Sequence, residues 1–245
     1  MSGTRRHRRW LIAGVSGGFG RQLALQALAA GDRVLGGVRD PARPLDLAGI
    51  RPDAFRAVRL DVTDAAGVRA FMDAAFAEPV DVVVSNAGHG LYAPVTDLTD
   101  EAVEELLGTN LRGSINVIRA AVPHLLAQGF GRVVQVSSHG GQVATAGNAL
   151  YHATKWGIEG FAEATAAELA GTGVGLTIVE PGGERLTGGQ LDPANHLPAA
   201  ELADAAAGTI ASLALDPAPL RLMVGTGARA LVGATLRRRI ADLAL

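Results

Sequence analysis

Short apolar runs of strand length alternate with longer segments of helical patterning along most of this chain. Strands that are joined through a helix run parallel, and a parallel sheet buries both of its faces under helices. The alternation therefore predicts an α/β fold, a doubly wound parallel sheet of about seven strands with helices on both faces. The expected strands are Trp10–Ala13, Arg33–Val38, Phe55–Leu60, Val80–Ser85, Gly131–Ser137, Val174–Pro181 and Leu220–Val224.

The predicted helices lie between these strands, and prolines limit them. Pro41 and Pro44 argue against a long regular helix before the third strand, and Pro123 predicts a kink or break in the longest helix. No repeat, low-complexity linker or charge block divides the 245 residues, so we expect a single domain over residues 1–245. The helices are expected at Gly18–Ala30, Ala65–Ala77, Asp100–Gln128, Leu150–Ala170 and Ala199–Leu215, with a last one ending at Arg237–Arg239.

Composition and charge exclude several functional classes. A net charge of -2 gives no reason to expect nucleic acid or an anionic membrane as a partner. The absence of cysteine excludes a disulfide scaffold and a thiolate metal site, and the histidines near the candidate site (His89, His139, His152) lack metal-ligand spacing. The basic start is similar to a twin-arginine export signal, but its apolar run breaks at Gly14 and is too short for one. We therefore expect a cytoplasmic protein with no metal.

A glycine-rich turn, Gly14-Val15-Ser16-Gly17-Gly18-Phe19-Gly20, joins the first strand to the first helix. Glycines at this junction let the backbone approach a pyrophosphate, whose charge is favoured by free N–H groups at the helix N-terminus. The turn predicts a Rossmann-type dinucleotide site, and the alternative is a tight turn that binds no ligand. The second strand ends with Val38 where NAD-binding folds carry a carboxylate, and Arg39 follows. Because a basic residue there accommodates a 2′-phosphate, NADP(H) is favoured over NAD(H). The alternative is that the Asp40 carboxylate binds the ribose 2′-hydroxyl of NAD.

The lone lysine of the chain, Lys155, stands four residues after Tyr151, one of two tyrosines. On a helix this spacing sets both side chains on one face. An ammonium beside a phenol can lower the phenol pKa from its ordinary value of about 10, helped by a cationic nicotinamide, and so create an acid/base couple. Ser138 follows a strand, where its hydroxyl could hydrogen-bond a substrate carbonyl. A solvent-facing helix pair is the alternative for Tyr151 and Lys155.

From Trp10 to about Gly182 these motifs resemble the short-chain dehydrogenase/reductase family. Tyr151-His152-Ala153-Thr154-Lys155 is similar to its Tyr-x-x-x-Lys motif, and Ser138 to its serine thirteen residues earlier. The resemblance implies that Tyr151 exchanges a proton with the substrate and that Ser138 polarises the carbonyl. It implies that Lys155 lowers the tyrosine pKa and holds the nicotinamide ribose. It further implies that Asn110 maintains a water for proton relay. It also implies cofactor contacts from the glycine turn (Gly14, Ser16, Gly18, Phe19, Gly20), Arg39, Asp61, Val62, Asn86, Ala87, Gly88, Pro181 and Gly182.

Two parts of the chain depart from this resemblance or carry few motifs. The family places a threonine four residues past the Pro-Gly turn, but Leu186 stands there and Thr187 is one position late. The segment around 183–198 is the expected substrate lid. The Ala-rich helices over Asp100–Gln128 and Leu150–Ala170 suit packing between subunits, so a homodimer or homotetramer is expected.

The function expected from the sequence is NADP(H)-dependent interconversion of a carbonyl and a secondary alcohol in a small molecule. A rival in the same fold is an isomerase, dehydratase or cyclase without net redox chemistry. A second rival is a non-catalytic dinucleotide sensor. The intact Ser138, Tyr151 and Lys155 argue against the sensor, since a sensor needs the glycine turn but not the acid/base couple.

Overall fold

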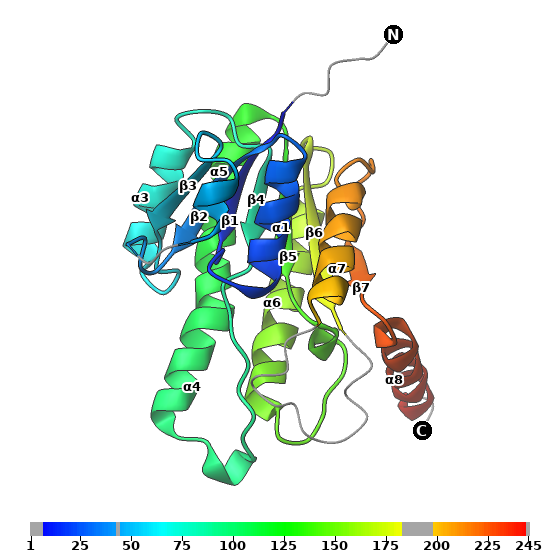
Figure 1. The fold of residues 1–245 in the computed structure, drawn as a ribbon. Helices are drawn as coiled ribbons and strands as arrows, with labels where there is room; N and C mark the ends of the chain where they lie inside the picture. The colour runs from blue at the N-terminus through cyan, green and yellow to red at the C-terminus, as the bar shows by residue number, and fades with distance from the viewer. Residues whose placement is uncertain (1–6, 43–44, 183–197, 244–245) are drawn as a thin grey trace.

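The computed structural model describes residues 7–42, 45–182 and 198–243, and these residues form a parallel sheet with helices on both faces (Figure 1). The strand order is β3-β2-β1-β4-β5-β6-β7, with every neighbouring pair parallel. The predicted α/β fold class is therefore confirmed. The strands are β1 (Arg9–Ala13), β2 (Arg33–Val38), β3 (Phe55–Arg59), β4 (Val82–Ser85), β5 (Gly131–Val136), β6 (Val174–Pro181) and β7 (Arg221–Val224).

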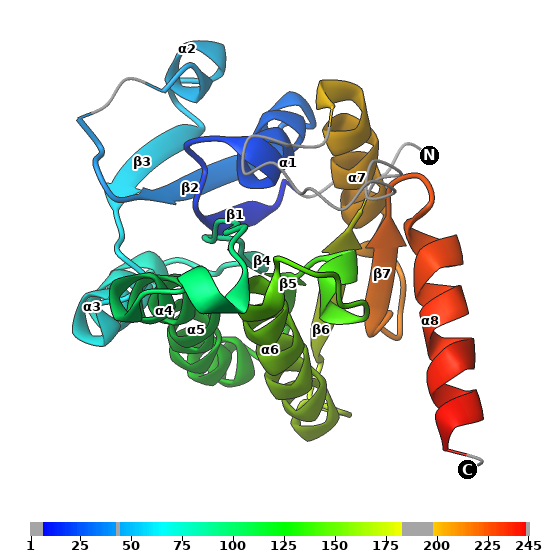
Figure 2. The same cartoon turned by 90° about the horizontal axis from the view of Figure 1, so that it is seen from below.

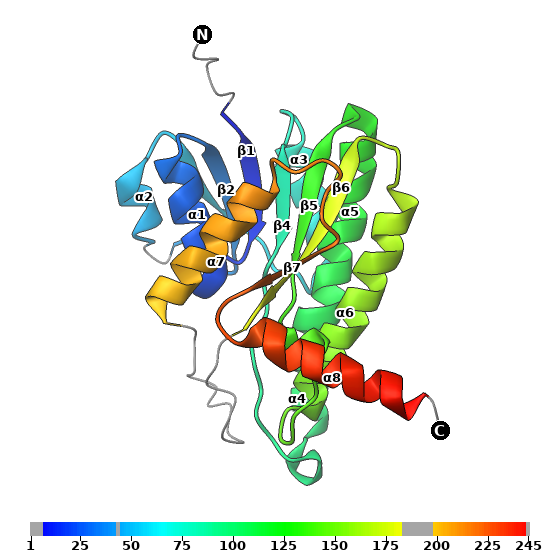
Figure 3. The ribbon, with the colours of Figure 1, turned by 90° about the vertical axis from the view of Figure 1, so that its right-hand side faces the viewer.

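Two helical layers enclose the sheet. Helices α1 (Gly18–Ala29) and α7 (Ala199–Ser212) pack on one face, and α3 (Ala65–Ala75), α5 (Ser114–Gln128) and α6 (Ala149–Glu168) pack on the other (Figures 2 and 3). Each face has its own core of aliphatic side chains, such as Trp10 and Ile12 under α1 and Leu11 and Val83 under α5. Alternate residues of one strand enter opposite cores because successive side chains of a strand point to opposite faces.

Helix α8 (Ala228–Asp242) lies outside the sheet beyond β7, and the short α2 (Leu47–Ile50) lies near the other edge (Figure 2). The last helix was expected to end at the arginines 237–239, but it continues to Asp242. Arg239 lies over the ring of the exposed Trp156 at 4.4 Å, which stabilises the arginine by a cation–π contact. Within the described residues, no helix is long and apolar enough to cross a bilayer.

The helix predicted over Asp100–Gln128 spans those residues but is not uniform. It comprises α4 (Asp100–Leu106), a π-helical stretch η2 (Leu107–Gly113) and α5, and it follows the short η1 (Val95–Asp97). A kink or break was expected at Pro123. The helix does not break there, since Pro123 lies inside α5. The irregular stretch lies earlier, at η2, where the side chain of Asn110 bonds the backbone of His89 beyond the end of β4. Wide π turns of this kind occur often at functional sites.

Candidate active site

A cavity of about 980 Å³ opens at the carboxyl ends of the strands, where β1 and β4 lie side by side. Parallel sheets of this topology bind ligands at this switch point. A second cavity, of about 870 Å³, lies at the amino ends of β5 and β6 and contains none of the site residues predicted from the sequence. The first cavity gathers nearly all of them, namely Gly14, Ser16, Gly18, Phe19, Arg39, Asp61, Val62, Asn86, Ala87, Gly88, Ser138, Tyr151, Lys155, Pro181 and Gly182.

The glycine turn forms one wall of this cavity, and its backbone is compact. Gly14 and Gly18 have φ values of 89° and 56°, a region that other residues rarely adopt. Gly20 lies behind the wall, where a β-carbon would overlap the carbonyl oxygen of Gly14 and the side chain of Asn86. The Asn86 amide donates to that same carbonyl at 2.7 Å and so ties the end of β4 to the turn. The turn therefore offers a close-packed backbone cradle of the kind a pyrophosphate needs.

The polar groups at the ends of β2 and β3 form the next part of the wall. Arg39 follows Val38 and faces the cavity together with Asp61 and Thr63. Hydrogen bonds from the Thr63 hydroxyl and backbone N–H hold the pKa of Asp61 below its ordinary value, and the charge of Arg39 adds to this effect. No carboxylate stands at the end of β2 itself.

Tyr151 and Lys155 lie on the cavity face of α6. The Lys155 Nζ is 5.7 Å from the centroid of the Tyr151 ring and donates to the Val136 carbonyl at 3.2 Å. Burial raises the pKa of the Tyr151 phenol, and a hydrogen bond with Ser138 opposes this. Burial also lowers the pKa of Lys155 to about 8, with Glu159 opposing. The geometry thus agrees with the i,i+4 expectation, but burial of the phenol outweighs the Ser138 hydrogen bond, so the tyrosine pKa is raised in the dinucleotide-free protein.

Ser138 lies between β5 and the short helix η3 (His139–Gly141), where it lines the cavity. Its Oγ accepts from the Gly140 N–H at 3.0 Å, which fixes the hydroxyl at the N-terminus of η3. Burial lowers the pKa of the adjacent His139, whose Nδ1 lies 3.3 Å from the Pro181 carbonyl oxygen. His139 is therefore a neutral wall of the cavity.

His152 has a structural place behind Ser138. Its Nε2 accepts from the Thr145 N–H at 3.0 Å, so Nδ1 carries the proton that bonds the Gly140 carbonyl at 2.8 Å. Burial lowers the pKa of His152. With both nitrogens engaged by the protein, His152 anchors η3.

Asn110 lies next to Thr154 in the α6 motif, under the cavity wall. Its Oδ1 accepts from the His89 N–H at 3.0 Å, and its Nδ2 donates to the His89 carbonyl at 2.8 Å and to the Thr154 hydroxyl at 3.3 Å. The side chain is 1% exposed. Asn110 therefore joins the β4 loop, η2 and α6 into one unit behind Tyr151 and Lys155.

Replacing Lys155 by Met should make the dinucleotide-free protein more stable at pH 7. The folded protein releases the Lys155 proton near pH 8, whereas the unfolded chain keeps it up to about the ordinary value of 10.5. Between these two values the unfolded state binds more protons, so wild-type stability rises with pH relative to the variant. We expect the difference in unfolding free energy to shrink by about 3 kcal/mol from pH 7 to pH 10.5. Urea unfolding at both pH values measures it, and a pH-independent difference would contradict the lowered pKa.

A family model described as short chain dehydrogenase matches residues 8–190. The chain belongs to the short-chain dehydrogenase family. The resemblance predicted from the motifs is thereby confirmed. The chain is 35% identical over 179 residues to "Oxidoreductase BOA17" of Botryotinia fuckeliana. The matched residues make up 72% of this chain and 65% of that protein. The chain thus spans just under two thirds of that relative.

Solved structures show the same likeness over more of the chain. A short-chain dehydrogenase from Streptomyces avermitilis superposes with a TM-score of 0.88 at 33% identity, covering 98% of this chain and 96% of that one. A gluconate 5-dehydrogenase from Burkholderia cenocepacia, in complex with NADP and tartrate, superposes with a TM-score of 0.77 at 27% identity, covering 91% and 95%.

Sequence reasoning missed several residues of this short-chain dehydrogenase's cavity. Glu201, Leu202 and Thr226 line it from α7 and the loop after β7, and no motif marked them. Tyr92 also lines the cavity, whereas Trp156 on the neighbouring part of α6 is 42% exposed under Arg239. The expected substrate lid, with Leu186 and Thr187, lies outside the described residues except for Pro198.

Proposed function

We propose that this short-chain dehydrogenase is an NADP(H)-dependent oxidoreductase that interconverts a carbonyl and a secondary alcohol in a small molecule. The observation that carries the proposal is that the glycine turn, Arg39, Ser138, Tyr151 and Lys155 all line one cavity. A dinucleotide fits this donor set, because the turn presents a close-packed backbone, and a β-carbon at Gly20 would push against the Gly14 carbonyl and Asn86 that hold the turn in place. When bound, the nicotinamide would supply or accept the hydride.

The roles of the protein's own residues follow from their places. The backbone of the glycine turn would hold the pyrophosphate, and Arg39 would pair with the 2′-phosphate. The Ser138 hydroxyl, fixed by the Gly140 N–H, would hold the substrate oxygen against the Tyr151 hydroxyl. Tyr151 would then deliver a proton to that oxygen in reduction, or remove it in oxidation. Lys155, whose Nζ is 5.7 Å from the centroid of the Tyr151 ring, would stabilise the phenolate.

In the dinucleotide-free protein the raised pKa keeps the Tyr151 phenol protonated at neutral pH. A phenol that keeps its proton at neutral pH is ready to donate it to a reduced carbonyl. Oxidation needs the phenolate, and the positive charge of an oxidised nicotinamide would help the Lys155 ammonium to stabilise it. Turnover with a panel of ketones and alcohols, followed by NADPH absorbance, tests the proposal. Substrate conversion at constant NADPH would favour an isomerase, dehydratase or cyclase instead.

Replacing Arg39 by Ala should weaken the binding of NADPH far more than the binding of NADH, because only NADPH carries the 2′-phosphate that a guanidinium pairs with. We expect the NADPH dissociation constant to rise by at least about 10-fold, which corresponds to about 1.4 kcal/mol. Fluorescence titration with both dinucleotides measures it. Equal effects on both would mean that another group reads the 2′-position, and tighter NADH binding in the wild type would reverse the cofactor assignment.

A further inference from the structure

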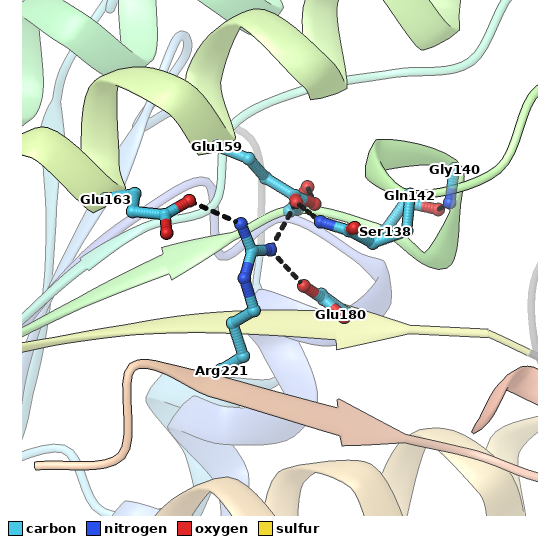
Figure 4. A network of polar contacts seen from close by, with 8 residues as sticks. Ser138, Gly140, Gln142, Glu159, Glu163, Glu180 and Arg221 are labelled. Carbon is cyan, nitrogen blue, oxygen red and sulfur yellow. Dashed lines mark hydrogen bonds and ion pairs between the residues drawn. The ribbon is translucent and has the colours of Figure 1, made fainter. Parts of the chain in front are cut away.

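A network of charged side chains lies beside the segment that carries Ser138 (Figure 4). Its centre is Arg221 on β7, which donates to Glu159 at 2.5 Å, to Glu180 at 2.6 Å and to Glu163 at 2.9 Å. Glu159 and Glu163 come from α6, and Glu180 comes from β6. One guanidinium thus joins three carboxylates from two elements on the face of the sheet under α6.

The three carboxylates differ in their environment. The Glu159 and Glu180 side chains are 3% and 0% exposed, whereas that of Glu163 is 55% exposed. Removing a carboxylate from water is costly unless it is paired, and replacing such buried pairs by apolar residues is often neutral or stabilising. Burial and the neighbouring Glu159 raise the pKa of Glu180, and its Oε2 has no hydrogen-bond partner within the described residues. Because burying these charges costs free energy, stabilisation of the fold does not by itself explain why the network is there.

The carboxylate of Glu159 bonds both ends of the catalytic segment, residues 137–142, which carries Ser138. Its Oε1 accepts from the Ser137 hydroxyl at 2.6 Å, and its Oε2 accepts from the Gln142 side-chain amide. These two partners bracket Ser138 and the whole of η3. Between them, Gly141 approaches the carboxylate so closely that a β-carbon at this position would overlap it. Glu159 therefore fixes both ends of the turn that presents the Ser138 hydroxyl.

We propose that Glu159, oriented by Arg221, is a positioning residue that holds residues 137–142 in the conformation that aims the Ser138 hydroxyl at the substrate. It lines neither the cavity nor the place of the reacting atoms. Its charge also raises the pKa of Lys155 one helical turn away, and the proposal concerns the separate action of Glu159 through Ser138. The inference rests on the proposed function for the role of Ser138, and it goes beyond it in naming what holds that residue in place. Arg221 stands 62 residues from Glu159, so the arrangement exists only when β7 is docked beside β6.

The test is a double-mutant cycle between Glu159→Gln and Ser138→Ala. The glutamine keeps the volume of the side chain but loses the charge that holds Arg221 and one of the two acceptors. We expect kcat to fall roughly 10- to 100-fold in the wild-type background, as for a misplacement of about 1 Å. In the Ser138→Ala background the same change should cost less than about 2-fold, because a residue that acts through Ser138 has nothing left to position. The dissociation constant for NADPH should stay within about 2-fold.

Glu163→Gln is the matched control, since it removes a carboxylate from the same arginine without touching the catalytic segment. It should leave kcat close to the wild-type value in both backgrounds. Hydrogen exchange provides a readout that needs no substrate. Peptides covering residues 137–143 should exchange faster in Glu159→Gln and unchanged in Glu163→Gln. If Glu159→Gln does not fold, Gln142→Ala removes one bond of the segment without unpairing a buried charge, and it should show the same pattern with a smaller loss.

Two results would overturn the inference. One is an equal loss of kcat from Glu159→Gln with and without the Ser138 hydroxyl, which would indicate that Glu159 acts through the general structure or through its charge on Lys155. The other is unchanged exchange of residues 137–143 in Glu159→Gln. A wild-type protein that reduces no carbonyl compound would remove the proposed function instead, and the exchange comparison would still decide whether Glu159 holds the segment.

Discussion

Tyr151→Phe is expected to lose at least ~100-fold in turnover while it binds NADPH as tightly as the wild type. A positioned acid or base contributes about that much or more to proton transfer, and phenylalanine keeps the ring while it removes the proton. The ring lies 5.7 Å from the Lys155 Nζ, so the packing of the pair survives the change. Steady-state rates with a ketone that the wild type reduces, together with fluorescence titration of NADPH, measure both quantities.

The other tyrosine offers a control for this variant. Tyr92 lines the same cavity, and its ring packs against Gly147, where a β-carbon would meet it. Tyr92→Phe removes a phenol of the same chemistry, and we expect a much smaller loss of turnover. Equal losses in the two variants, or unchanged turnover in Tyr151→Phe, would remove Tyr151 from the mechanism.

Gly20→Ala is expected to produce the second large loss, this time in cofactor binding. A β-carbon at Gly20 would overlap the Gly14 carbonyl and the Asn86 amide, and these are the groups that tie the turn to β4. Overpacking of a rigid site costs about 1–3 kcal/mol, which corresponds to about 5- to 150-fold in the dissociation constant for NADPH. Titration calorimetry with NADPH, together with thermal unfolding, separates weaker binding from a general loss of stability.

Gly17→Ala is the matched control on the same turn. Nothing lies within 4 Å of a β-carbon built there, and its backbone is extended, with φ at -174°. We expect NADPH affinity close to that of the wild type. If Gly17→Ala weakens NADPH binding as strongly as Gly20→Ala, then any side chain added to the turn weakens binding. The close packing of Gly20 against Asn86 would then not be the cause.

The sequence predicted the fold well because each element is indicated by local signals. Alternating apolar runs predicted all seven strands, and β2 and β6 have the bounds that were expected. The other strands differ by one or two residues at an end, and the larger differences fall in helices, where tertiary contacts compete with local patterning. The bond between Asn110 and the backbone of His89 lies in the irregular η2, and the proline that was expected to break the helix is accommodated inside α5.

The residues of the candidate site were predictable because they belong to short motifs with fixed spacing. The glycine turn and the Tyr151–Lys155 pair need no more than a strand-to-helix junction and one helix face. The remaining wall could not be predicted in this way. Glu201 and Thr226 reach the cavity from α7 and from the loop after β7, and their sequence neighbourhoods carry no pattern that indicates a ligand.

The sequence alone thus determined the order of the chemistry-bearing residues along the chain. It also determined that Tyr151 and Lys155 share one helix face. Only the tertiary structure decided how these groups titrate and what holds them. Burial raises the pKa of the phenol and lowers that of the ammonium, and burial is a property of the assembled layers. The Glu159–Arg221 pair likewise joins residues far apart in the chain, which meet only because β7 lies beside β6.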